Sequence, residues 1–177
     1  MSLTARELWG VIHGLGLGSL FLLAFGGGLA GLYSLRRDLL TEAGLRERMR
    51  RLNWGAWGMA AVAWATVISG TWKVYPWYRA TPPEGTTDLM DFPRYRLLAS
   101  EATAGWHSFG MEWKEHVAWI APILATAVAF IVWRYGDRLA DDARLRRAVT
   151  IMFVMAFLAA AVAGVYGAFI TKAAPVL

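Results

Sequence analysis

The chain has 177 residues, of which 57% are hydrophobic, and it contains ten tryptophans but no cysteine. The absence of cysteine excludes disulfides, thiolate zinc sites, iron–sulfur clusters and covalently attached c-type haem. The net charge of +5 does not indicate nucleic-acid binding, because the arginines flank long apolar runs, as they do in membrane proteins. The sequence therefore predicts an integral membrane protein.

Four apolar runs are long enough to cross a bilayer, which takes about 20 residues. They lie at about 8–33, 54–72, 117–135 and 148–170. The first run is too long for a cleaved signal peptide, and little positive charge precedes it. Short links follow the first and third runs, so each of these helices has an antiparallel neighbour. We expect an all-α, up-down bundle of four transmembrane helices in one domain, residues 1–177.

The links between the runs differ in charge. Six arginines lie between residues 36 and 51, and five lie between residues 134 and 147. The positive-inside rule places both arginine-rich links in the cytoplasm, so both termini and the link 73–114 lie outside. The expected location is a bacterial cytoplasmic membrane. The link 73–114 is too apolar for a free linker, and we expect an ordered outer loop with a short helix near 95–104.

Small residues recur at helical spacing in the first run. Gly10, Gly14 and Gly18 form a G-x-x-x-G series. Such series let helix backbones approach closely, and that packing role is one interpretation. The other interpretation is that the glycines make room for a flat ligand between helices.

Histidines lie near the outer end of two runs. His13 lies in the first run on a face of small residues, and His116 opens the third run at a similar depth. Two histidines at matched depth on different helices are what a bis-imidazole haem requires. Glu112 lies one turn before His116 and can accept the proton of one imidazole nitrogen. His107 is expected outside this site, because nine residues of unbroken helix turn it to the opposite side. For each histidine the alternative is a hydrogen-bonded interfacial residue.

This pattern resembles small four-helix membrane b-type cytochromes, in which histidines on different helices hold haem inside the bundle. His13, His116 and the glycines of the first run carry the resemblance. It implies one haem b with His13 and His116 as the metal ligands and Glu112 behind them. The sequence lacks the four membrane histidines of the diheme b561-like pattern. Propionates need cationic partners, which this level of the chain supplies as Lys73, Arg79, Arg94, Arg96 and Lys114.

The segment "YPWYR" at the exit of the second run adds an aromatic group. Tyr75, Trp77 and Tyr78 are able to wall a haem or stack on a quinone ring. An equally simple interpretation is an interfacial anchor, since Trp and Tyr are enriched at membrane surfaces.

These features favour a non-catalytic electron-transfer subunit of a larger complex, which exchanges electrons with quinol or an outer cytochrome. Its expected partners are the lipid bilayer and other membrane subunits. One alternative is a structural subunit of a respiratory or photosynthetic complex, without a cofactor or with one histidine bound to a pigment. Another is a metal-dependent membrane enzyme that uses His13, His107, His116 and Glu112 around zinc, copper or iron.

Transport is poorly supported by the helix interiors. Their main polar side chains are Thr66, Ser69, Thr126 and Thr150. A hydroxyl in a helix can bond a carbonyl of the preceding turn, and we expect each of these to do so. They would then leave no polar pathway across the bilayer.

Overall fold

The computed structural model describes residues 3–174, and every regular element in that part of the chain is a helix. The all-α prediction is therefore confirmed. The chain divides into two compact units, each built from separate stretches of sequence. Unit 1 comprises residues 1–18, 65–119 and 160–177, and unit 2 comprises residues 19–64 and 120–159. The units are described in turn.

Three helical stretches have the length and apolar composition needed to cross a membrane. They are Ala5–Ser34, Glu101–Asp141 and Ala143–Ala173 among the described residues. They include the predicted runs 8–33, 117–135 and 148–170, and they support the membrane assignment. Most of the run 54–72 lies in helix α3, Glu42–Ser69, which is outside this set. Its arginine-rich start and its tryptophans and glycines make α3 less apolar than the other three.

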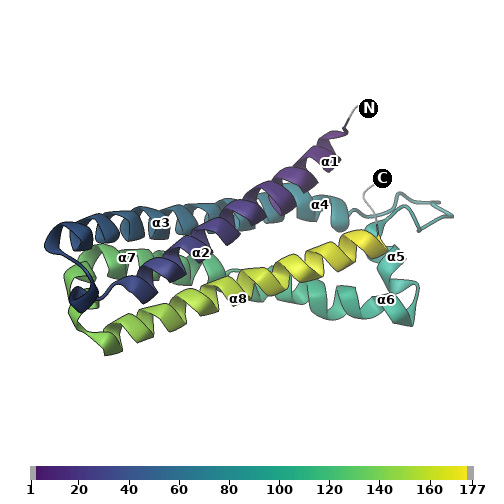
Figure 1. The fold of residues 1–177 in the computed structure, drawn as a ribbon. Coiled ribbons are helices and arrows are strands. Elements are labelled where there is room, and N and C mark those ends of the chain that lie inside the picture. Colours follow the sequence, from purple (N-terminus) through teal and green to yellow (C-terminus); the bar gives the residue numbers. More distant parts are fainter. Residues whose placement is uncertain (1–2, 175–177) are drawn as a thin grey trace. The chain divides into compact units, whose positions relative to one another are not determined.

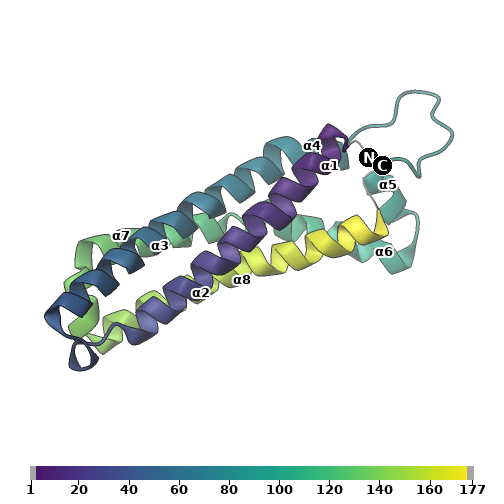
Figure 2. The same cartoon turned by 45° about the horizontal axis from the view of Figure 1, so that its top comes forward.

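Unit 2 is a bundle of four helix segments (Figures 1 and 2). They belong to α2 (Gly18–Ser34), α3, α7 (Ile120–Asp141) and α8 (Ala143–Ala173). Leu32, Met59, Val132 and Phe153 are fully buried in its core. The Phe153 ring fills the space where Gly28 has no side chain, so a glycine sets how closely α2 approaches α8.

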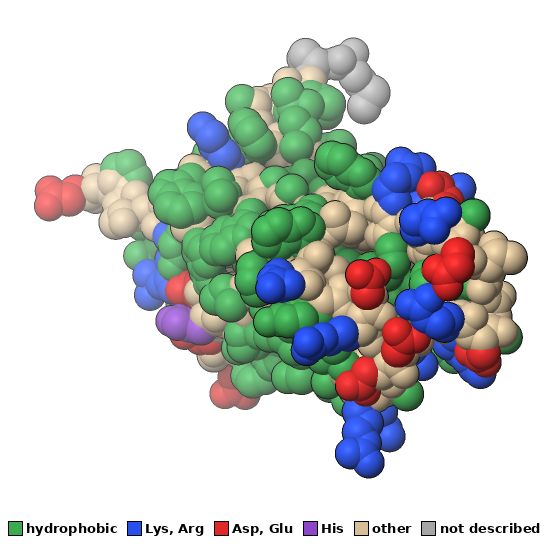
Figure 3. All heavy atoms as spheres, turned by 90° about the vertical axis from the view of Figure 1, so that its left-hand side faces the viewer, with side chains coloured by type: hydrophobic (Ala, Val, Ile, Leu, Met, Phe, Trp, Pro, Cys, Tyr) green, Lys and Arg blue, Asp and Glu red, His purple; other side chains and the backbone are tan. Residues whose placement is uncertain are grey.

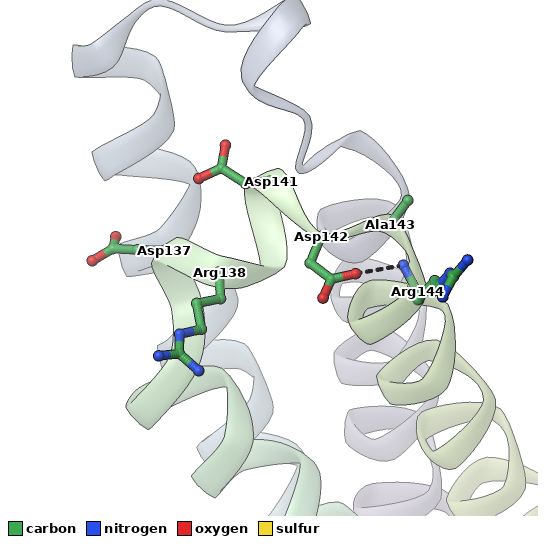
Figure 4. Close-up of a pocket in the computed structure, with 6 residues that line it drawn as sticks. All are labelled: Asp137, Arg138, Asp141, Asp142, Ala143 and Arg144. Carbon is green, nitrogen blue, oxygen red and sulfur yellow. Dashed lines mark hydrogen bonds between the residues drawn. The ribbon is translucent and has the colours of Figure 1, made fainter.

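The turn between α7 and α8 is fixed by side chains that bond the free ends of both helices. Asp142 Oδ1 accepts hydrogen bonds from the backbone N–H of Arg144 at 2.8 Å and of Leu145 at 3.0 Å. Arg146 Nη1 donates to the Leu139 carbonyl at 2.7 Å. Asp142 is thus the N-cap of α8, where a carboxylate satisfies amides that have no helical partner. Asp142 also lines a cavity of about 520 Å³ at this turn. Figure 4 shows the lining residues, which are Asp137, Arg138, Asp141, Asp142, Ala143 and Arg144.

Unit 1 contains the whole of the predicted outer loop, 73–114, and much of that segment is helical. Its short elements are α1 (Ala5–Gly10), η1 (Val11–Leu17), η3 (Gly70–Val74), α4 (Tyr75–Tyr78), α5 (Pro93–Leu98), α6 (Glu101–Gly105), η4 (Trp106–Met111) and η5 (Trp113–Val117). Leu97 of α5 is completely buried in a cluster with Tyr78, Met111 and Ile170. This cluster holds the segment in place through its apolar side chains.

The third apolar helix begins earlier than its predicted start at residue 117. Helical residues begin at Glu101, after Ser100, whose hydroxyl accepts a hydrogen bond from the Ala102 amide. The predicted helix near 95–104 is two short helices, α5 and α6, that Ser100 separates. Sequence hydropathy missed the earlier start because charged and histidine side chains interrupt the apolar residues of 101–116. The structure pairs several of those polar side chains with other parts of unit 1.

Candidate functional site

All three histidines of the chain lie in π-helical segments of unit 1. His13 belongs to η1, His107 to η4 and His116 to η5. A π-helical turn contains an extra residue, which displaces side chains from their ordinary helical positions, and such turns are frequent at functional sites. Unit 1 therefore contains the candidate site.

His13 is held by a relay of two hydrogen bonds to the end of α3. Its Nδ1 lies 3.0 Å from Ser69 Oγ, and Ser69 Oγ donates to the Thr66 carbonyl at 3.1 Å. The serine hydroxyl has one proton and gives it to Thr66, so Oγ accepts from the Nδ1–H group of His13. We infer from this network that Nε2 of His13 is the unprotonated nitrogen.

Gly70 gives the His13 ring its space. A Cβ atom at residue 70 would lie 2.9 Å from Cε1 of His13, which is closer than unbonded carbon atoms approach. Gly10, Gly14 and Gly18 differ, because a Cβ atom at any of them would meet nothing within 4 Å. One glycine is thus required for packing the imidazole, and three border open space.

His116 bonds within its own helix. Its Nδ1 lies 3.0 Å from the backbone oxygen of Glu112 and 3.4 Å from the Glu112 carboxylate oxygen Oε2. A carbonyl oxygen only accepts, so Nδ1 carries the proton and Nε2 again has the lone pair. The His116 side chain is 70% exposed, which leaves Nε2 open to a ligand or to another subunit.

His107 has the opposite arrangement. Its Nδ1 lies 2.6 Å from the hydroxyl oxygen of Tyr78, a residue that is only 7% exposed. The phenol donates this bond, because otherwise its own proton would be buried without an acceptor. Burial raises the pKa of Tyr78 above its ordinary value, against the positive charge of Arg79, so the phenol stays protonated. His107 therefore has its proton on Nε2.

An ion pair lies beside this histidine. Arg79 Nη2 donates to both carboxylate oxygens of Glu115, at 2.8 and 3.1 Å, and the two side chains are 28% and 19% exposed. The hydrogen bond to Glu115 raises the pKa of Arg79. The Arg79 guanidinium also lies over the Tyr75 ring at 5.4 Å. Among the described residues, Nε of Arg79 and Nε of Arg94 are buried without a hydrogen-bond partner.

Lys114 was predicted as a counter-charge at the outer surface, and the structure turns it inward. Its Nζ atom lies 3.4 Å from the Ala163 carbonyl of α8. Gly167 provides the space, because a Cβ atom there would lie 2.8 Å from Nζ. Sequence analysis missed this glycine. Its separation of one helical turn from Ala163 was the only available signal.

The structure gives the predicted site residues separate partners. His13 contacts the end of α3, His116 contacts Glu112, and Arg79 contacts Glu115. No group of three or more histidine, aspartate or glutamate side chains able to hold a metal ion occurs within residues 3–174. Comparison of the chain with protein-family models, curated proteins and solved structures gave no match. Function must therefore be argued from the chemistry of these side chains.

Proposed function

We propose that the chain is a membrane electron-transfer subunit that binds one haem b through Nε2 of His13 and Nε2 of His116. The observation that carries the proposal is the set of hydrogen-bond partners of Nδ1 in the three imidazoles, from which we inferred the protonated nitrogen. His13 and His116 both donate from Nδ1 to a fixed oxygen. Histidines that ligate metals almost always donate their other N–H in this way, which fixes the ring and exposes the lone pair. In His107 the proton is on Nε2 and the Nδ1 lone pair accepts from Tyr78. Neither nitrogen is then available to a metal, so His107 is not a ligand in this proposal.

The donor chemistry fits a haem iron, for which two neutral imidazoles are common axial ligands. The open space beside Gly10, Gly14 and Gly18 suits a flat macrocycle next to His13. The buried Nε atoms of Arg79 and Arg94 lack acceptors, and a propionate oxygen is such an acceptor. The haem would supply one-electron redox chemistry. The chain itself would fix the imidazoles and place positive charge near the propionates.

Helix α3 serves as the fourth membrane pass in this proposal. The part of α3 that follows Arg51, residues 52–69, extends about 27 Å, and η3 continues the helix, so together they match the roughly 30 Å of the hydrocarbon core. The arginines in the first half of α3 lie in the cytoplasm together with the α7–α8 turn, and both termini lie outside. The haem then lies near the outer face of a bacterial cytoplasmic membrane. It exchanges electrons with quinol or an outer cytochrome, as part of a larger complex.

An absorption spectrum of the purified protein, oxidised and then reduced, tests the proposal. We expect the sharp reduced bands of a low-spin b-type haem. His13→Ala and His116→Ala should each remove the haem or make it high-spin, and His107→Ala is the matched control that should keep the spectrum. An unchanged low-spin spectrum in either ligand variant would show that the pairing is wrong.

The exposure of His116 favours one second candidate. A lone pair on a side chain that is 70% exposed is available to a cofactor held by a neighbouring subunit. The chain would then be a structural subunit that ligates a haem or pigment at its surface. This candidate predicts a featureless visible spectrum for the isolated chain, and a spectrum sensitive to His116→Ala only in the assembled complex.

A further inference from the structure

A groove between α2 and α8 is a candidate binding site within unit 2. Its volume is about 820 Å³. The residues that line it include Gly26, Ala30, Tyr33, Arg36, Arg146 and Arg147. The lining side chains that α2 contributes are mostly apolar or small. None of these lining residues is acidic, and three are arginines. The groove therefore joins an apolar channel to a positively charged end.

Part of the groove is lined by a glycine, Gly26, which has no side chain. A Cβ atom added to Gly26 would meet nothing within 4 Å, so this glycine borders empty space and packs against no neighbour. The surfaces of both helices beyond the groove are apolar and exposed, including Leu22, Leu23, Met155 and Leu158. Exposed apolar residues on a helix that crosses a bilayer contact lipid chains. The groove is thus continuous with a lipid-facing surface.

The three arginines differ in how far their charge is already compensated. Arg36 forms an ion pair with Asp38 at 2.6 Å. Arg146 donates to two uncharged carbonyl oxygens, those of Leu139 and Ala140, so these bonds position its guanidinium without neutralising it. Arg147 is exposed.

Asp38 and Asp142 act on this end of the groove, because each interacts electrostatically with Arg146. Asp38 pairs with Arg36, and Asp142 is engaged with the amides at the start of α8. Figure 3 views the side of the molecule that carries the inter-helix turns and shows lysine and arginine side chains interspersed with acidic ones. The three arginines of the groove outnumber these two aspartates, so the groove end retains a net positive charge.

We propose that this groove binds an anionic phospholipid. Its phosphate lies against Arg146 and Arg147, and an acyl chain lies along Gly26 and Ala30. Basic side chains at the membrane interface attract anionic lipid, and basic pockets between transmembrane helices bind anionic head groups. Tyr33, whose side chain is an exposed aromatic at the same end, suits the head-group level. This proposal shares the membrane location with the proposed function and does not depend on haem.

Lipid retention by the delipidated full chain in uncharged detergent tests the proposal. Native mass spectrometry would compare dioleoyl phosphatidylglycerol with dioleoyl phosphatidylcholine. Each arginine near an anionic head group contributes about a factor of five in affinity, so we expect a preference for phosphatidylglycerol of roughly tenfold or more. The double variant Arg146→Gln/Arg147→Gln should lose most of this preference for phosphatidylglycerol. Equal retention of the two lipids by the unmodified chain would overturn the proposal.

The matched control is Arg50→Gln/Arg51→Gln, which removes two arginines of the same unit that pair with Glu47 and lie outside the groove. It should keep the preference. If the control loses as much as the groove variant, general charge and not the groove is responsible, and the proposal fails. Circular dichroism of both variants establishes that their helices are intact.

The acyl chain and the head group are tested separately. Gly26→Leu fills open space, so it should fold normally and weaken binding of phosphatidylglycerol. Unchanged binding would show that no chain lies in the groove. Glycerol 3-phosphate, which has the charged group without the chains, should compete poorly. Full competition at equal concentration would identify a site for free phosphate and overturn the lipid assignment. The haem spectrum is a separate readout, so the two proposals can fail independently.

Discussion

The Nδ1 atom of His13 lies 3.0 Å from the Oγ atom of Ser69, 56 residues away in the sequence. Ser69 is only 8% exposed, so this bond fixes the first helix to the end of α3 away from water. If His13 ligates haem, Ser69→Ala should lower haem occupancy or shift the midpoint potential, because the ring loses its N–H acceptor. Ser69→Thr, which keeps the hydroxyl, should largely restore both. A redox titration checks this, and identical titrations for all three proteins would contradict it.

Adjacent glycines of α2 should respond in opposite ways to alanine. A Cβ at Gly28 would overlap the Phe153 ring, whereas a Cβ at Gly27 would meet nothing within 4 Å. Gly28→Ala should therefore destabilise the protein by about 1–3 kcal/mol through overpacking. Gly27→Ala should be neutral or slightly stabilising, because alanine is the better helix former. Unfolding in mixed micelles measures both, and equal stabilities would contradict the packing of α2 on α8.

The Arg79–Glu115 ion pair should contribute to stability. Both side chains are more than two-thirds buried, so Glu115→Gln leaves a guanidinium without its charged acceptor. We expect a loss of about 1–3 kcal/mol in the free energy of unfolding. Glu84→Gln, in an exposed part of the same unit, is the control and should change little. A double-mutant cycle with Arg79→Met measures the coupling energy between the two side chains. A coupling energy near zero would mean that the ion pair does not contribute to stability.

Lowering the pH should destabilise the start of α8, because it protonates the capping carboxylate of Asp142. The backbone amides of Leu145 and Arg144 hold the pKa of Asp142 below its ordinary value of 3.8. The ionised cap therefore stabilises the fold fully above that value and less as the pH falls through the lowered pKa. Asp142→Asn keeps a capping oxygen that does not titrate. The variant should show a smaller drop in melting temperature between neutral pH and about pH 3. Parallel drops in both proteins would exclude Asp142 as the titrating cap.

Single cysteines test the proposed orientation in a chain that has none of its own. Gly44→Cys lies in the first arginine-rich link, and Thr87→Cys lies in the predicted outer segment. In intact cells an impermeant maleimide should label residue 87 and spare residue 44, since arginine-rich links stay in the cytoplasm. Labelling of residue 44 without lysis would reverse the topology. It would leave the helical structure of either unit unaffected.

Helical structure and its apolar character were predictable because they depend on local sequence. Runs of apolar residues fix where helices form and which can enter a bilayer. The predicted backbone bonds of Ser69, Thr126 and Thr150 are also confirmed, since each hydroxyl bonds a carbonyl of its own helix. Such bonds span three or four residues, and sequence spacing describes them well.

Side-chain partners across the fold were not predictable in the same way. Arg79 and Glu115 lie 36 residues apart, and their ion pair is visible only in the folded chain. Rotation counted at 100° per residue holds only in an α-helix. The segments that carry the histidines are π-helical, so that count misplaces the faces of the helix beyond them.

The sequence by itself determined that this chain is helical, apolar and free of thiol chemistry, because composition and periodicity are local properties. Only the tertiary structure decided which nitrogen of each histidine carries the proton. That choice depends on whether the nearest atom is the Ser69 hydroxyl, the Glu112 carbonyl or the Tyr78 phenol. Two of these three contacts join residues far apart in the chain. Which atom donates and which accepts in these contacts depends on how the helices pack, and the spacing of residues in the sequence does not encode that packing.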